Sequence, residues 1–197
     1  MVPSSLLAAG WAGCDQAYPG DSLGGFEVRG SLVEQSCGVS IVMPNDPLDF
    51  EVELRRDGST IYWRRPGAPA MDGHFSERNQ SFELSATSSF LLREASPADG
   101  LGPCRIMQQE TIGGRLEVVT DPSAPVIPAS DAGASDPDAG APAPIYRFSG
   151  ENSVSFSVAS GADCRDRIGV EQGQFPMLPC RIRYELEGEP MEEAPDW

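Results

Sequence analysis

The sequence predicts an all-β protein, an antiparallel β-sandwich or barrel built from hairpins, with a long disordered loop. Three observations lead to this prediction. Many short stretches alternate between apolar and polar residues, and Gly, Pro, Asn and Asp separate them. Residues 50–65 have the pattern of a β-hairpin. No stretch of about ten residues or more keeps the helical period, so we expect little helix.

The hairpin is the clearest local element. Asp57-Gly58 is a strong signal for a two-residue turn, because a type I′ turn needs positive φ at both positions. This turn sets Leu54 opposite Ile61, and Val52 opposite Trp63. The apolar side chains of both strands then share one face of the sheet, and the charged side chains share the other.

The remaining strands are expected in order along the chain. The first two are FEVRGSLVE (26–34) and CGVSIVM (37–43). Residues 74–95 are expected to form a hairpin that turns near Asn79, followed by a further strand. After them come one long strand or two in 104–119 with a break at Gly113-Gly114, an alternating stretch at 145–160, and two strands within 161–189.

The composition divides the chain into one domain with flanking segments. Residues 121–144 are rich in Ala, Pro and Asp and contain no aromatic residue, which predicts a disordered loop. Only about 45 residues with strand patterns follow this loop, and so few rarely fold alone. We therefore expect a single β domain over 25–188, with an acidic tail at 189–197. Two related β modules in tandem are the alternative.

The charge excludes some partners. The chain carries 30 acidic and 14 basic residues, all of the latter arginine, for a net charge of −16. Nucleic acids and anionic lipid surfaces both require clustered positive charge. We therefore expect no nucleic-acid partner and no docking on lipid through a basic patch.

The N-terminal stretch SLLAAGWAGC predicts a processing site. Trp11-Ala12-Gly13-Cys14 matches the lipobox of bacterial lipoproteins at three of four positions. Residues 1–13 are then a signal peptide, Cys14 is the lipidated residue, and 14–24 form a polar tether. An exported or cytosolic protein with an unmodified cysteine is the alternative.

Together with the Asp/Ala/Pro/Gly-rich loop and the cysteine usage, this N-terminus resembles uncharacterised lipoproteins of myxobacterial-type, high-GC soil bacteria. The resemblance implies an exported protein anchored by lipid in the cell envelope, at the outer membrane or cell surface rather than the inner membrane. It implies no particular activity.

The four other cysteines are even in number and can form two disulfides. Pro-Cys-Arg-Ile occurs twice, at 103–106 and 179–182, and suggests two similar halves. The symmetric interpretation pairs Cys37 with Cys104 and Cys164 with Cys180, and two other connectivities remain open. Since no cysteines have the close spacing of a zinc site, we predict no metal, and since no Gly-rich phosphate loop is present, we predict no cofactor.

One cluster of side chains is a candidate binding patch. It lies on the predicted hairpin and consists of Arg55, Arg56, Tyr62, Arg64 and Arg65. Such a patch is able to bind an anion, a protein partner or an acidic glycan. The favoured alternative is a solvated sheet face on which Glu51 and Glu53 pair with these arginines across the strands.

Two further features are not expected to take part in catalysis or metal binding. His74 is the only histidine and follows a turn, so we expect an exposed or cross-strand position. Residues 136–140, DPDAG, resemble the start of a calcium loop, but Arg147 stands where such a loop needs a glutamate.

The sequence therefore predicts a non-catalytic module of the cell envelope that binds an unknown ligand or has a structural role. The alternative is an extracellular or periplasmic hydrolase that acts on an envelope or extracellular polymer through a pair of carboxylates.

Overall fold

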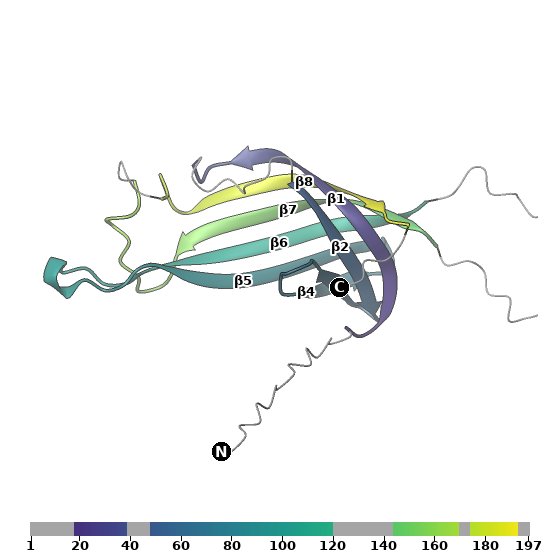
Figure 1. Ribbon diagram of the computed structural model, residues 1–197, viewed down its shortest axis with the longest axis horizontal. Coiled ribbons are helices and arrows are strands. Elements are labelled where there is room, and N and C mark those ends of the chain that lie inside the picture. Colours follow the sequence, from purple (N-terminus) through teal and green to yellow (C-terminus); the bar gives the residue numbers. More distant parts are fainter. Residues whose placement is uncertain (1–17, 39–47, 120–143, 170–173, 193–197) are drawn as a thin grey trace, which may run out of the picture.

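The computed structural model describes residues 18–38, 48–119, 144–169 and 174–192, and these form a closed antiparallel β-barrel of eight strands (Figure 1). Each strand pairs with the next one along the chain, and β8 pairs with β1 to close the barrel. The all-β prediction is confirmed, in its barrel form. The strands are β1 (Asp21–Gln35), β2 (Leu48–Asp57), β3 (Thr60–Arg64), β4 (Met71–Ser76), β5 (Ser81–Arg93), β6 (Cys104–Val118), β7 (Tyr146–Val158) and β8 (Cys180–Pro190), and a short 3-10 helix, η2 (Pro97–Asp99), lies between β5 and β6.

Two of the strands are much shorter than the rest. β3 has 5 residues and β4 has 6, whereas β5, β6 and β7 have 13, 15 and 13. Figure 1 shows β5 to β8 continuing well past β4, with β1 and β2 crossing them. The barrel is therefore complete at one end, and at the other end it continues without β3 and β4.

Aromatic rings fill the inside of the complete part. The ring of Trp63 lies 5.7 Å from that of Phe148 and 6.3 Å from that of Phe82, measured between centroids. Phe26 lies 5.3 Å from Phe148, edge to face. None of the four side chains is more than 3% exposed. Because alternate residues of each strand point inward, the apolar alternation of the sequence produces this core directly.

The β2–β3 hairpin forms, but its turn lies one residue later than predicted. Asp57 pairs with Thr60, so Gly58 and Ser59 are the turn residues. Gly58 has a φ of 58°, and a glycine in the first turn position is the pattern of a type II′ turn. The prediction failed because a glycine can occupy the first position of one turn type as easily as the second position of another.

The predicted faces of the hairpin are nevertheless correct. Leu54 pairs with Trp63 instead of Ile61, a register shift of two residues. A shift by two residues leaves each side chain on its own face, whereas a shift by one would reverse them. Val52, Leu54, Ile61 and Trp63 are accordingly buried inside the barrel.

Several predicted boundaries change. β1 begins at Asp21, so the end of the predicted tether (14–24) is strand, and β8 runs two residues past the predicted domain end at 188. Residues 104–118 form one strand with no break at Gly113-Gly114. Only one strand, β8, forms among the described residues of 161–189. Most of the predicted strand at 37–43, and residues 121–143 of the predicted loop, lie outside the described residues.

The disulfides are Cys37–Cys180 and Cys104–Cys164, so the predicted pairs Cys37–Cys104 and Cys164–Cys180 are wrong. The closure of the barrel explains the first bond. β1 pairs with β8 up to the contact of Gln35 with Ile182, which brings Cys37 beside the start of β8. This disulfide therefore fastens the seam at which the two ends of the barrel wall meet.

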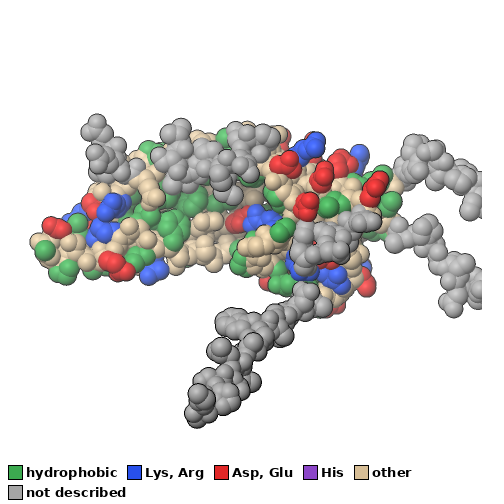
Figure 2. Space-filling view, in the orientation of Figure 1, with side chains coloured by type: hydrophobic (Ala, Val, Ile, Leu, Met, Phe, Trp, Pro, Cys, Tyr) green, Lys and Arg blue, Asp and Glu red, His purple; other side chains and the backbone are tan. Residues whose placement is uncertain are grey.

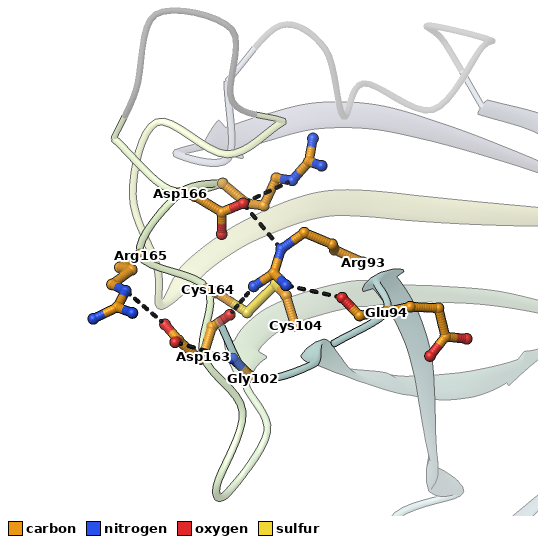
Figure 3. The surroundings of a disulfide bond; sticks show 9 residues. Arg93, Glu94, Gly102, Cys104, Asp163, Cys164, Arg165 and Asp166 are labelled. Carbon is orange, nitrogen blue, oxygen red and sulfur yellow. Dashed lines mark hydrogen bonds and ion pairs between the residues drawn. A yellow bond between two sulfur atoms is a disulfide. The ribbon is translucent and has the colours of Figure 1, made fainter. Parts of the chain in front are cut away.

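The second disulfide fastens the connection that follows β7. Cys104 begins β6, next to the end of β7, and Cys164 lies in the turn beyond it. Arg93 of β5 holds the same turn, because its guanidinium pairs with Asp166 at 2.9 Å and donates to the Asp163 carbonyl oxygen at 2.8 Å (Figure 3). The two disulfides also indicate an oxidising compartment, extracellular or periplasmic.

Candidate functional site

One part of the barrel wall lacks a strand among the described residues. β5 pairs with β4 only as far as Leu84, but with β6 as far as Arg93. On the other side, β2 pairs with β3 only from Glu53 onward, but with β1 from Leu48. Beyond the β3–β4 turn, the described residues therefore place no strand between β2 and β5. We call this region the open side.

Apolar side chains of the inner face are incompletely covered at the open side. Phe50 of β2 and both Ala86 and Phe90 of β5 are only half-buried, although each packs against the core. Figure 2 shows hydrophobic side chains gathered over the part of β5 to β7 that extends past β4, with an acidic and a basic side chain next to each other beside them. In contrast, the complete part of the barrel is filled.

Three polar side chains, which we call the inner polar group, lie on the inner face next to these apolar ones. They are Arg65, just after β3, Glu110 of β6 and Asn152 of β7. One carboxylate oxygen of Glu110 lies 3.7 Å from the Arg65 guanidinium, and the other accepts a 2.9 Å hydrogen bond from the Asn152 amide. The Arg65 guanidinium also covers the ring of Phe50, 5.5 Å from its centroid. The group is well buried: the side chains of Arg65 and Glu110 are 23% and 14% exposed, and Asn152 is 1% exposed.

The oxygen of the Asn152 amide and the indole N–H of Trp63 are buried and have no hydrogen-bond partner among the described residues. The orientation of the amide follows from Glu110, since a carboxylate accepts from the NH₂ side and would repel the oxygen. A buried polar atom without a partner is costly. The Asn152 oxygen belongs to the inner polar group, whereas Trp63 lies among the core rings of the complete part of the barrel.

The predicted arginine patch does not form one surface. Arg55 and Arg64 lie on the outer face, where both bind Glu53, at 2.9 and 3.1 Å. Glu53 is only 6% exposed, and the Arg64 guanidinium also covers the ring of Tyr18. Tyr62 lies on this face as well, with its ring 5.9 Å from that of Tyr18. This cluster connects the first described residues to the β2–β3 hairpin.

The other two arginines of the predicted patch point elsewhere. Arg56 pairs with Glu77 at 3.4 Å and covers the ring of Phe75, at the end of the barrel opposite the open side. Arg65 belongs to the inner polar group. Glu53 is thus the cross-strand partner that the alternative interpretation expected, but it is buried instead of solvated.

The other candidate residues are placed as follows. His74 of β4 is exposed and lies between Thr60 and Glu83 of the neighbouring strands, as predicted. Cys14 and residues 136–140 lie outside the described residues. In the described ranges, no group of three or more His, Cys, Asp or Glu residues is placed to hold a metal ion. The same part of the chain contains no helix of the length and hydropathy needed to cross a membrane.

Sequence reasoning missed Glu110 and Asn152. One signal was present in the alternation of residues 104–116, where Cys104, Ile106 and Ile112 are buried. Gln108 and Glu110 occupy the same face of this strand, so they interrupt an apolar row, and Glu110 does so with a charge. A charged residue in such a row is a candidate functional residue, because burial of an unpaired charge is costly.

Comparisons of the chain with protein-family models, curated proteins and solved structures found no match.

Proposed function

We propose that this chain is a non-catalytic, lipid-anchored binding module of the bacterial cell envelope, and that it takes an apolar or amphiphilic small molecule at the open side of its barrel. The observation that carries the proposal is the set of half-buried apolar side chains next to the inner polar group. Mouths of β-barrels that combine apolar walls with a few polar groups are common ligand sites.

The anchor rests on separate support. The two disulfides use four cysteines and leave Cys14 as the fifth. Its lipobox-like surroundings and the resemblance to lipoproteins of myxobacterial-type bacteria favour acylation there. The outer membrane or cell surface is the proposed location.

The lipid anchor predicts a specific mature protein. When the chain is expressed in a bacterium with the N-terminus printed above, we expect loss of residues 1–13 and a mass increase at Cys14 from attached acyl chains. The product should fractionate with membranes. Cys14→Ser should remain unprocessed and carry no acyl chain. An intact mass that retains residues 1–13 with an unmodified Cys14 would exclude the anchor.

The binding proposal predicts that a charge at the open side weakens the binding of an apolar probe. N-phenyl-1-naphthylamine, whose fluorescence rises in apolar surroundings, should bind the protein saturably. Phe90→Glu should weaken binding by about tenfold or more, because a carboxylate then enters the apolar wall. Titration with the probe measures the dissociation constants of the unmodified protein and of Phe90→Glu. Far-UV circular dichroism checks that the variant is folded.

Ser89→Glu is the matched control. Ser89 is the neighbouring residue on β5 and is exposed on the other face, so the same charge is added outside the barrel. Its affinity for the probe should equal that of the unmodified protein. Absence of saturable binding, or an equal loss in both variants, would refute the proposal.

The hydrolase alternative draws no support from the two well-buried glutamates. Glu53 lies on the outer face and Glu110 on the inner face, and each already binds arginine. They therefore cannot act as acid and base on one bond.

A further inference from the structure

We infer that the ligand of the open side is an uncharged amphiphile, with an apolar chain and a hydroxyl or amide head group. This inference rests on the proposed function and specifies its ligand class. It follows from the charge balance and from the hydrogen-bonding capacity of the inner polar group.

The charges of the inner polar group already cancel. Arg65 carries one positive charge and Glu110 one negative charge, and their side chains lie 3.7 Å apart. An anionic head group would compete with Glu110 for Arg65 and add a second negative charge to a half-buried site. A cationic head group would conflict with Arg65 in the same way. An uncharged head group avoids both the repulsion by Glu110 and the repulsion by Arg65.

The remaining hydrogen-bonding capacity fits a hydroxyl or amide group. Both oxygens of Glu110 are engaged, one by Arg65 and one by Asn152. The Asn152 oxygen is left as an acceptor. A hydroxyl or amide can donate a hydrogen bond to it, whereas a carboxylate can only accept. A cationic head group is disfavoured by the charge of Arg65.

The apolar part of the ligand has a surface of suitable length. From Ala86 to Arg93, β5 runs beside the open side for about 23 Å at the usual rise of a strand. Phe90 lies along this path, and its ring contacts that of Phe156 on β7. Ala86, Phe90 and Leu92 supply apolar contacts along this wall, with Ser88 between the first two, so an alkyl chain of medium length can lie along it.

Three probes with the same alkyl chain test the head group: n-decanol, decanoate and decyltrimethylammonium. Their affinities are measured by displacement of N-phenyl-1-naphthylamine, below the concentrations at which they form micelles. We expect n-decanol to bind about tenfold more tightly than either ion. Equal or tighter binding of decanoate or decyltrimethylammonium would overturn the inference.

Variants that remove one charge test the role of the ion pair between Arg65 and Glu110. Glu110→Gln leaves Arg65 without its carboxylate, and decanoate should gain about tenfold relative to n-decanol. Arg65→Gln should produce the opposite gain, for decyltrimethylammonium, and it provides an independent test if Glu110→Gln does not fold. An unchanged preference in the folded variants would overturn the inference.

Glu53→Gln is the matched control, since it makes the same chemical change on the outer face. It should leave the order of the three probes unchanged, and an equal shift in this variant would overturn the inference. Failure of the two proposals can be told apart. If the naphthylamine and all three probes fail to bind, the proposed function is refuted, whereas a preference for an ion refutes the ligand class alone.

Discussion

Replacing both Cys37 and Cys180 by serine should lower the free energy of unfolding by about 4 kcal/mol. The two cysteines are 143 residues apart, and a cross-link over so long a loop removes much of the entropy of the unfolded chain. The bond also holds the seam between β1 and β8, the one strand pair whose members come from opposite ends of the chain. Urea unfolding followed by circular dichroism measures the loss.

Both the reference protein and the variant should carry Cys14→Ser, so that a fifth thiol cannot exchange with the disulfides. A peptide map of the oxidised reference protein should contain Cys37 linked to Cys180. An unchanged unfolding midpoint in the serine variant would contradict the prediction. So would a map in which Cys37 is linked to Cys104.

The repeated Pro-Cys-Arg-Ile motif misled the prediction of the disulfides for a structural reason. Its cysteines, Cys104 and Cys180, begin β6 and β8, and in each case the following isoleucine is buried inside the barrel. The motif thus marks two equivalent strand starts at the same end of the barrel. Which cysteine lies near each start depends on the strand neighbours, and a local motif does not contain that information.

Local patterns were sufficient for most of the fold. Alternation placed Val52, Leu54, Ile61 and Trp63 on the inner face, even though the turn was displaced by one residue. The choice between sandwich and barrel was different, because it depends on whether β1 pairs with β8. The pairing of β1 with β8 joins segments that are distant in the sequence, so it cannot be predicted from a local pattern.

The candidate site shows the same limit. Arg64 and Arg65 are adjacent in the sequence, yet one binds Glu53 outside the barrel and the other approaches Glu110 inside it. A row of arginines therefore suggested one patch where strand alternation separates the side chains. The contact between Asn152 and Glu110 joins β7 to β6, and it could be foreseen only after these strands were known to be neighbours.

Trp63→Ala should destabilise the protein by about 4 kcal/mol, because the largest fully buried side chain would be lost and a cavity would remain. The indole contacts rings from three other strands: Phe50 of β2, Phe82 of β5 and Phe148 of β7. With a total stability of about 5–15 kcal/mol for a typical domain, such a loss is a large fraction of the whole. Urea unfolding followed by circular dichroism measures it without using the missing tryptophan.

Tyr62→Ala is the matched control, because Tyr62 is the adjacent residue on β3 and its ring lies on the outer face beside Tyr18. Since this side chain is only half-buried, its removal should cost about 1 kcal/mol. Both variants remove an aromatic ring from the same short strand, so the change in strand propensity is similar. The difference between them measures the packing inside the barrel, and an equal loss in both would show that the aromatic cluster around Trp63 does not stabilise the fold.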